Sequence, residues 1–423
     1  MNIIVHNSKA SGEVKIPASK SDMHRAIIAA SLANGISVIK NITLSNDINA
    51  TIKAFEALGA KIEINEDELI IQGIKEFNNP KNTLINCDES GSTLRFIIPI
   101  LSMFNNEFTL YGSKTLFSRP LNIYEEIYKK QGLNFKLSSN TLTVQGKINP
   151  DEYVIKGDVS SQFISGLLFT LPLLNQESKI TIIKPFESES YVNMTLKTLK
   201  SFGIEIRRIS RTEFIIPGNQ KYTPRVYEVE GDYSQFAFFA VLGAINGEIT
   251  CSGLNKDSIQ GDRLILDILK SFNVDYHIRN DKITIHKCYE IKGSLIDLSD
   301  CPDLGPICMI LSLFSLTPVR ITNIHRLRLK ESNRVDSMIV NLRKLGAQIE
   351  AFDNYMIIYP SYLKASKEVL NSFNDHRVMM SLVVLGSMIR GSTLIDNPQC
   401  IKKSYVNFYK DIQSLGIEVG LHD

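Results

Sequence analysis

Cationic side chains stand beside hydroxyl or carboxylate side chains in five short segments of this sequence. These segments are Lys20-Ser21 with Arg25, Arg119 in "FSRPL", Lys330-Glu331-Ser332-Asn333-Arg334, Asp375-His376-Arg377, and Lys402-Lys403. Arginine binds carboxylate or phosphate through two parallel hydrogen bonds, and lysine acts as a point charge. In a chain whose net charge is only +2, so many clustered cations predict a substrate with several negative charges.

Two uncharged segments and two acids extend this chemistry. Ser160-Ser161-Gln162 and Ser188 with Tyr191 supply hydroxyl groups that suit phosphate oxygens. Glu331 adjoins Lys330, and Asp303 is expected at the start of a buried helix. A carboxylate and a neighbouring ammonium group shift each other's pKa, which is common in acid–base catalysis. Each acid also has a simpler interpretation as a counter-ion, and both interpretations stay open.

The elements that must position these residues are repeated six times. Each repeat contains a helix end, a turn and a strand, as in "FEALGAKIEI" and "LRKLGAQIEA". The turn residues are Gly59, Gly132, Gly203, Asn273, Gly346 and Gly416, at intervals of 73, 71, 70, 73 and 70 residues. Glycine or asparagine after a helix end predicts a left-handed C-cap. A fixed period of this length predicts an architecture of repeated units.

A polar cluster opens a long apolar run ahead of each turn. These runs predict six buried helices that begin near residues 20, 91, 160, 233, 303 and 375. A helix N-terminus offers free N–H groups and the positive end of the helix dipole, which favours an anion. Each cluster alone is also explained as a helix cap. Cations such as Lys20, Arg95 and Arg377 oppose the dipole, so a ligand or a buried acid is expected beside them.

The composition is that of an ordinary globular protein. The chain has 423 residues, of which 43% are hydrophobic, and two to three domains are expected. Its small net charge gives no indication of a nucleic-acid partner, no apolar stretch is long enough for a membrane span, and no signal peptide is visible. The six cysteines lack CxxC spacing, which predicts reduced thiols in a cytoplasmic protein without a metal site.

In combination these segments resemble the EPSP synthase family of carboxyvinyltransferases. The resemblance covers essentially the whole chain and rests on "PASKSDMHR", "ESGSTLR", "SRP", "SSQF", "EGDYSQ", "CPD", "LKESNR" and "NDHR", in this order. It implies transfer of the carboxyvinyl group of phosphoenolpyruvate to the 5-hydroxyl of 3-phosphoshikimate, with release of phosphate by addition and elimination. It implies no metal and no organic cofactor. The family is inhibited by glyphosate, which occupies the phosphoenolpyruvate site.

The resemblance also implies a fold and an assembly. The fold class is α/β: a two-domain inside-out α/β barrel, each domain with three repeated units, buried parallel helices and outer four-stranded sheets. Domain I is expected at residues 1–19 plus 230–423, and domain II at residues 20–229. A cytoplasmic monomer is expected, whose partners are the two small-molecule substrates.

Roles follow from the resemblance residue by residue. Lys20 is expected to contact both substrates and to take part in catalysis. The other residues implied for 3-phosphoshikimate are Ser21, Arg25, Ser160, Ser161, Gln162, Ser188, Tyr191, Asp303 and Lys330. Those implied for phosphoenolpyruvate are Gly91, Arg119, Gln162, Arg334, Arg377 and Lys403. Asp303 is expected to accept the proton of the 5-hydroxyl, and Lys330 and Glu331 to transfer protons at the methylene carbon.

Three other classes of protein remain as alternatives. The carboxyvinyltransferase that acts on UDP-N-acetylglucosamine resembles this chain, but it carries a reactive cysteine in a Gly-rich loop, and Cys87 lies in no such loop. RNA 3′-phosphate cyclase shares related units, and a non-catalytic anion-binding protein would use the same cations. Glu89 and Arg326 stand where family members have asparagine, so details of both subsites stay open.

Overall fold

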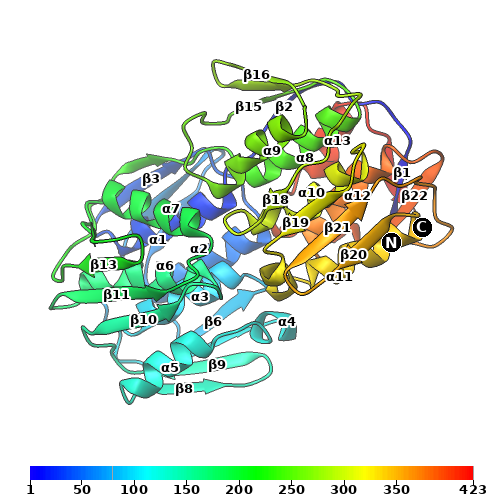
Figure 1. Ribbon diagram of the computed structural model, residues 1–423. Helices are drawn as coiled ribbons and strands as arrows, with labels where there is room; N and C mark the ends of the chain where they lie inside the picture. Colours follow the sequence, from blue (N-terminus) through cyan, green and yellow to red (C-terminus); the bar gives the residue numbers. More distant parts are fainter. Residues whose placement is uncertain (79, 423) are drawn as a thin grey trace. The chain divides into compact units, whose positions relative to one another are not determined.

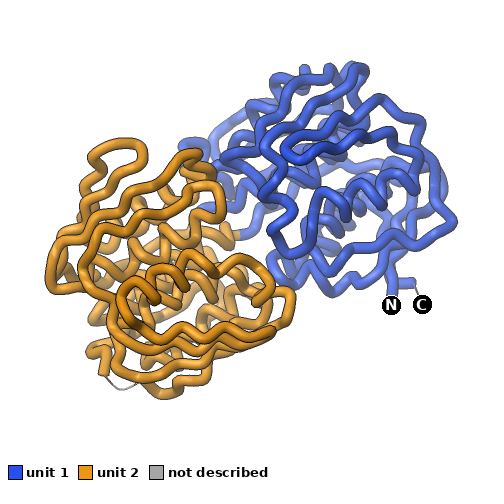
Figure 2. The backbone as a smooth tube through the Cα atoms, turned by 60° about the horizontal axis from the view of Figure 1, so that its bottom comes forward, with its two compact units in different colours: residues 1–17, 230–423 blue, residues 18–229 orange. Residues whose placement is uncertain are grey.

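The chain forms two compact units in the computed structural model, which describes residues 1–78 and 80–422. Unit 1 consists of Met1–Pro17 and Glu230–Asp423, and unit 2 of Ala18–Val229 (Figure 2). Each unit contains three of the six repeats.

Six helices begin at or next to the positions where the sequence predicts buried helices. They are α1 (Lys20–Leu32), α3 (Gly91–Leu101) and α6 (Ser161–Thr170) in unit 2, and α8 (Tyr233–Ile245), α10 (Gly305–Leu313) and α12 (His376–Gly386) in unit 1. Every residue of α8, α10 and α12 is buried, and these three helices pack against one another (Figure 1). Burial on all sides explains why their sequences are apolar all round. The prediction of six buried helices is confirmed.

Close packing of α3 against α6 in unit 2 depends on a glycine. A Cβ on Gly166 of α6 would lie 2.7 Å from the backbone oxygen of Arg95 on α3 and would also meet the Tyr124 hydroxyl. A larger residue would therefore push the two helices apart. The helices of unit 2 that carry predicted site residues are held in this tightly packed core.

A second helix in each repeat ends at the predicted turn. These helices are α2 (Asn46–Leu58), α5 (Asn122–Lys130), α7 (Glu189–Ser201), α9 (Ile265–Ser271), α11 (Arg334–Lys344) and α13 (Phe408–Ser414). All six turn residues have positive φ, from +65° at Asn273 to +113° at Gly59. Asparagine serves in the fourth repeat because its short polar side chain tolerates the left-handed region. The predicted left-handed turns are confirmed.

Shorter helical segments complete the chain between these elements. They are α4 (Lys114–Phe117) and the 3₁₀ turns η1 (Leu171–Leu173), η2 (Gly261–Leu264), η3 (Pro302–Leu304), η4 (His325–Leu329) and η5 (Pro398–Lys403). Three of them, η3, η4 and η5, carry or adjoin residues that the sequence assigns to the site.

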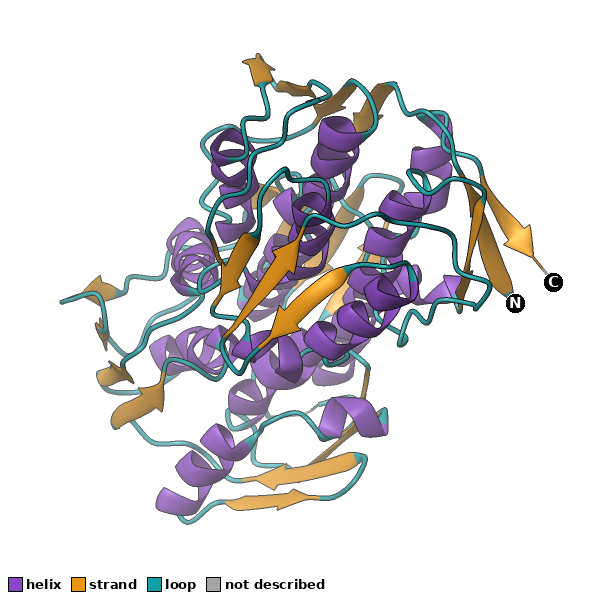
Figure 3. Ribbon diagram, turned by 45° about the vertical axis from the view of Figure 1, so that its right-hand side comes forward, coloured by secondary structure: helices purple, strands orange, loops and turns teal. Residues whose placement is uncertain are grey.

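Each repeat also contributes a small sheet, which Figure 3 shows in orange among the purple helices. In unit 2 the strands, in order across each sheet, are β14 (Val226–Glu228), β3 (Ile36–Lys40), β5 (Glu68–Gln72) and β4 (Lys61–Ile64); β6 (Leu84–Asp88), β7 (Phe108–Gly112), β9 (Thr141–Gln145) and β8 (Asn134–Leu137); and β10 (Glu152–Lys156), β11 (Ser178–Ile183), β13 (Glu213–Ile216) and β12 (Arg207–Arg208). In each sheet the first two strands run parallel and the others pair antiparallel.

Two sheets of unit 1 follow the same order. They are β2 (Gly12–Lys15), β15 (Ile249–Ser252), β17 (Lys282–Ile285) and β16 (Tyr276–Arg279); and β18 (Ile296–Asp297), β19 (Val319–Thr322), β21 (Tyr355–Tyr359) and β20 (Gln348–Ala351). The third contains β22 (Ser392–Asp396), β1 (Asn2–His6) and β23 (Val419–His422).

This third sheet corrects the expectation of four strands in every repeat. Where the other sheets have a parallel edge strand, the described residues have one isolated bridge, between Leu370 and Ile395. The next two amides leave the ladder, since Asn371 N donates to the Asn341 side chain and Ser372 N donates to the Asp396 side chain. Local side-chain acceptors of this kind compete with sheet formation.

The chain passes from one unit to the other twice, each time after a parallel edge strand. Residues 12–15 of β2 pair with β15 of unit 1 before the chain enters α1, and residues 226–228 of β14 pair with β3 of unit 2 before it enters α8. The N-terminal strand β1 lies between β22 and β23, so both ends of the chain belong to one sheet of unit 1.

Replacing Gly132 tests the left-handed turn without a change in packing, because an added Cβ would meet no atom within 4 Å. Its φ is +69°, where alanine is disfavoured by about 1 kcal/mol. We expect Gly132→Ala to lower the midpoint of thermal unfolding, and Gly132→Asn to lower it less, since asparagine fills the equivalent position 273. Equal midpoints for the two variants would contradict a conformational requirement at this turn.

Candidate active site

Lys20 is the first residue of α1, the helix that opens unit 2. Ser19 caps this helix by accepting a hydrogen bond from Asp22 N. The Lys20 ammonium group lies 2.8 Å from a carboxylate oxygen of Asp47 in the first turn of α2. A nearby acid therefore balances this cation, which was one of the two explanations that the sequence left open. The sequence analysis did not single out Asp47, although "SND" is recognisable as a helix start.

Arg25 ties α1 to α7. Its guanidinium group donates to the backbone oxygens of Ser21 at 2.6 Å and Tyr191 at 2.9 Å, and to Thr195 Oγ1 at 2.8 Å. The residue is 2% exposed, and burial lowers its pKa to about 10, with a partial offset from Asp22. It therefore stays charged at neutral pH. The structure brings Arg25, Ser21 and Tyr191 into one cluster, as the predicted site requires.

A second cluster of unit 2 forms where α3 meets α6. A Cβ on Gly91 would lie 3.0 Å from Arg119 Nη1 and 3.7 Å from Gln162 Oε1. The Gln162 side chain accepts from Arg95 Nη1 at 2.8 Å and donates to Ser92 Oγ at 2.9 Å. Gly91, Arg119 and Gln162, all assigned to phosphoenolpyruvate, are thus neighbours. The sequence analysis noted Arg95 only as a cation at a helix start, yet it orients Gln162.

The serines assigned to 3-phosphoshikimate lie at the starts of two packed helices, α6 and α7. Ser160 caps α6 and accepts from Gln162 N at 3.3 Å, and Ser161 is the first, buried residue of that helix. Ser188 stands directly before α7, is buried, and has φ +52°. A non-glycine residue in this region is strained, and such positions are frequent at functional sites.

In unit 1 the predicted residues surround one guanidinium group. Arg334, the first residue of α11, is 1% exposed. Its Nε lies 2.8 Å from Asp375, its Nη1 2.9 Å from Asp303, and its Nη2 2.6 Å from Glu331. Burial disfavours the charge, but the three carboxylates outweigh it and raise the pKa of Arg334. The sequence analysis did not assign Asp375, which is the N-cap of α12.

Asp303 lies on η3 and contacts three cations. Its carboxylate is 3.1 Å from Lys330, 2.9 Å from Arg334 and 3.1 Å from Arg377. Burial acts to raise the pKa of Asp303, but these cations, Arg377 foremost, hold it well below the ordinary value. The group is therefore ionised at neutral pH. In this arrangement it is a counter-ion, and a carboxylate of low pKa is a weak general base.

Lys330 follows η4 and is the natural candidate for proton transfer. Burial lowers its pKa, Asp303 partly opposes this, and the charges of Arg326 and Arg334 add to the lowering. A lysine whose pKa is lowered toward neutral pH exchanges protons more readily than an exposed lysine. Glu331 is adjacent in sequence, and its carboxylate binds Arg334.

The remaining predicted residues lie at the start of α12 and on η5. Arg377 Nη2 donates to Ser234 Oγ at 2.9 Å, at the start of α8. Lys403 is 9% exposed and donates to the backbone oxygen of Asn374 at 2.5 Å. Lys402 beside it is exposed, which favours the interpretation of that residue as a solvated surface charge.

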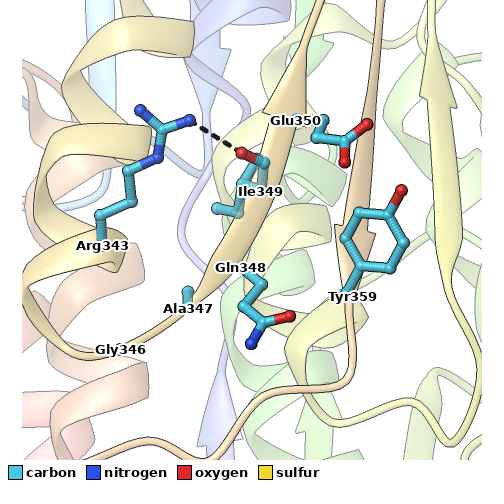
Figure 4. Close-up of a pocket in the computed structure, with 7 residues that line it drawn as sticks. All are labelled: Arg343, Gly346, Ala347, Gln348, Ile349, Glu350 and Tyr359. Carbon is cyan, nitrogen blue, oxygen red and sulfur yellow. Dashed lines mark hydrogen bonds between the residues drawn. The ribbon is translucent and has the colours of Figure 1, made fainter.

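A separate hollow on unit 1 does not belong to this site. It is lined by Arg343, Gly346, Ala347, Gln348, Ile349, Glu350 and Tyr359 (Figure 4). Arg343 donates there to the backbone oxygen of Ile349 at 2.8 Å. None of the residues assigned to a substrate is among those lining it.

No cluster of three or more metal-ligating side chains is found in the described part of the chain. Nor does that part contain a helix long and apolar enough to cross a bilayer.

Sequence comparisons with known proteins agree with one another. A family model described as EPSP synthase (3-phosphoshikimate 1-carboxyvinyltransferase) matches residues 4–412. The 3-phosphoshikimate 1-carboxyvinyltransferase of Clostridium novyi is 43% identical, with 98% of this chain and 97% of that protein covered. The protein of the same name from Clostridioides difficile is also 43% identical, with 97% of both chains covered.

Solved structures support the fold. An EPSP synthase from Acinetobacter baumannii superimposes with a TM-score of 0.82 at 21% identity, and all of both chains is covered. The enolpyruvyl transferase NikO from Streptomyces tendae gives a TM-score of 0.82 at 14% identity, over 99% of this chain and 98% of that one. At these identities the likeness concerns the fold, and it agrees with the expected two-domain α/β architecture.

Replacing Asp303 with a neutral residue is expected to lower the stability of unit 1 toward unfolding, by an amount that depends on pH. Its lowered pKa means that its contribution to stability is complete above the ordinary aspartate pKa of about 3.9 and is lost as the pH falls through the lower folded-state pKa. Removing one partner from a buried ion cluster costs about 3 kcal/mol or more. We therefore expect Asp303→Asn to lower the unfolding midpoint at pH 7, and the gap to close below about pH 4.

Asp336→Asn is the matched control, because that carboxylate is 62% exposed and its bonds to the side chains of Arg328 and Asn333 both lie at the surface. It is expected to change the midpoint little at any pH. A gap for Asp303→Asn that is constant from pH 7 to pH 3 would contradict a lowered pKa.

Proposed function

Because the chain belongs to the EPSP synthase family, we propose how its residues perform the family's reaction. The enzyme transfers the carboxyvinyl group of phosphoenolpyruvate to 3-phosphoshikimate, in the shikimate pathway of aromatic amino-acid biosynthesis. One observation carries the proposal: the family match over residues 4–412 includes every residue assigned to a substrate, from Lys20 to Lys403. The clusters described above supply the chemistry that two phosphate- and carboxylate-bearing substrates need.

In unit 2 we assign 3-phosphoshikimate to the starts of α1, α6 and α7. The hydroxyls of Ser160, Ser161 and Ser188 would hold its phosphate, since helix N-termini and hydroxyl groups favour phosphate oxygens. Arg25 would bind its carboxylate. Three of the five guanidinium donors are already used within the protein, which leaves two for a ligand. Ser21, Gln162 and Tyr191 would line the ring.

Phosphoenolpyruvate is assigned to Gly91, Arg119 and Gln162 of unit 2, and to Arg334, Arg377 and Lys403 of unit 1. Lys20 would contact both substrates. The mutual contacts of Gly91, Arg119 and Gln162 support the first group. Arg334 and Arg377 are held by Asp303, so a substrate carboxylate would share donors that this acid already orients.

Addition and elimination need protons at two atoms. The 5-hydroxyl oxygen adds to C2 of phosphoenolpyruvate while C3 gains a proton, and the tetrahedral intermediate then loses phosphate and a proton from C3. The lowered pKa of Lys330 suits it to proton transfer at C3, with Glu331 beside it. Asp303, which contacts Lys330 at 3.1 Å, would accept the proton of the 5-hydroxyl as its oxygen bonds to C2. The protein is further proposed to be cytoplasmic and monomeric, and its six free thiols support a reducing compartment.

Phosphate release tests the activity directly. We expect the purified chain to release phosphate from phosphoenolpyruvate with 3-phosphoshikimate and not with UDP-N-acetylglucosamine. Lys20→Ala should abolish release, on the scale of at least two orders of magnitude, because a cation that contacts both substrates is lost. Its fold should survive, since the ion pair with Asp47 lies at a partly exposed position. Release that depends on the nucleotide sugar, or near-normal turnover by Lys20→Ala, would refute the assignment.

Gly91→Ala tests the phosphoenolpyruvate subsite. The added methyl would lie 3.0 Å from Arg119 Nη1, so this group must shift slightly, and 3.5 Å from Arg95 Nη1, which is an ordinary contact. Glyphosate occupies this site in the family and is slightly longer than the substrate. We expect a large rise in the glyphosate inhibition constant and a smaller rise in the KM for phosphoenolpyruvate. Gly420→Ala, where a Cβ meets nothing, is the control. Equal changes in both constants would place Gly91 outside the subsite.

A further inference from the structure

Four buried polar side chains form a hydrogen-bonded chain across α1, α2 and α3 of unit 2, the helices in blue to cyan in Figure 1. His24 Nδ1 lies 2.7 Å from Thr51 Oγ1, Thr51 Oγ1 lies 2.7 Å from Thr93 Oγ1, and Thr93 Oγ1 lies 2.8 Å from Ser90 Oγ. His24, Thr51 and Ser90 are 0% exposed, and Thr93 is 1% exposed. The proposed reaction uses none of the four.

The contacts fix the order of the protons. At the last contact Thr93 donates and Ser90 accepts. Thr93 has then spent its only hydroxyl proton, so Thr51 must donate to Thr93. Thr51 has in turn spent its own proton, so the remaining donor for the first contact is an Nδ1–H of His24.

This order also suits the far side of the imidazole ring. His24 Nε2 has no hydrogen-bond partner among the described residues, and a bare ring nitrogen leaves no buried N–H unpaired there. Burial, with the charges of Lys20 and Arg25, holds the pKa of His24 well below its ordinary value. The ring is therefore a neutral donor of fixed tautomer.

Each end of the chain lies beside a residue assigned to phosphoenolpyruvate. Ser90 is the N-cap of α3 and also accepts from Thr93 N at 3.2 Å, so two donors hold its Oγ. Gly91 follows it directly. At the other end His24 stands four residues after Lys20, on the same face of α1. The hydrogen-bonded chain thus joins the second turn of α1, which begins at Lys20, to the start of α3, which begins at Gly91.

We propose that His24 is a positioning residue for the phosphoenolpyruvate subsite. As a fixed Nδ1–H donor it orders the hydroxyls of Thr51 and Thr93, which hold the Ser90 cap and with it the start of α3 relative to α1. The inference rests on the proposed function, because it takes Gly91 and Lys20 to bind that substrate.

Thr51→Val tests the proposal by replacing the central hydroxyl with a methyl group of similar size. Loss of a buried hydrogen bond predicts a roughly fivefold to tenfold rise in the KM for phosphoenolpyruvate. The KM for 3-phosphoshikimate should rise less than that for phosphoenolpyruvate. The chain of hydrogen bonds ends at the Ser90 cap beside Gly91, whereas the serines assigned to the phosphate of 3-phosphoshikimate stand at the starts of α6 and α7. Thr51→Ser keeps the hydroxyl and should restore the wild-type KM.

Thr170→Val is the matched control. It removes an equally buried hydroxyl that bonds only within α6, to Gly166 O at 3.1 Å, and both KM values should stay at wild-type level. An equal rise in the KM for both substrates, or a rise reproduced by Thr170→Val, would show a general structural role and overturn the proposal. Wild-type protein that releases no phosphate would refute the proposed function, and this inference with it, before any variant is compared.

The tautomer gives a readout that does not depend on a variant enzyme's activity. In ¹⁵N spectra of histidine-labelled wild type at pH 7, the His24 signal, assigned by its loss in His24→Gln, should show a protonated Nδ1 and an unprotonated Nε2. A proton on Nε2 would reverse the order of donors and overturn the proposal even if Thr51→Val failed to fold.

Discussion

Unit 1 depends on the burial of one guanidinium group. A buried cation is costly unless carboxylates surround it, and Arg334 has three of them, from η3, from its own helix start and from the cap of α12. Lys330 and Arg377 also contact Asp303, so three cations face three carboxylates. The charges of these six groups therefore balance one another before any substrate arrives. A substrate anion must compete with these carboxylates for the N–H donors of the cations. Binding of the anion therefore replaces one ion pair with another.

Arg25 of unit 2 is held differently. Arg25 makes its hydrogen bonds to two backbone oxygens and a hydroxyl, all of them neutral acceptors, and Phe96 lies under its guanidinium group. Neutral acceptors orient a cation without cancelling its charge, so its field stays available to an anion. The hydrogen-bonded chain from His24 to Ser90 likewise consists of uncharged groups. The repeated fold thus supports an ion cluster around Arg334 in unit 1, and a hydrogen-bonded cluster around Arg25 in unit 2 whose acceptors are uncharged.

The sequence predicted those features that local physical chemistry determines. Six left-handed turns follow from Gly or Asn after a helix end, and six buried helices follow from apolar runs without a polar face. The sequence did not predict which side chains form ion pairs or hydrogen bonds with one another. Asp47 beside Lys20 and Asp375 beside Arg334 are 27 and 41 residues from their partners, and no periodicity brings such pairs together. The sequence analysis assigned no role to His24, and the order of donors that we infer for it rests on contacts between helices. The three-stranded sheet was missed because two side chains, at Asn341 and Asp396, capture the amides that would have continued an edge strand.

The strand order constrains the sequence of events during synthesis. Unit 2 is complete once β14 has been made, because that strand supplies the last edge of its sheets at residues 226–228. Strand β1 precedes unit 2 along the chain, yet its partners are β22 and β23, at residues 392–396 and 419–422. Strand β1 must therefore wait, unpaired, until both of these strands have been translated, whereas β2 can pair with β15 once residues 249–252 have been made. Domains generally fold as units during synthesis. Unit 2 is therefore expected to fold first and unit 1 second.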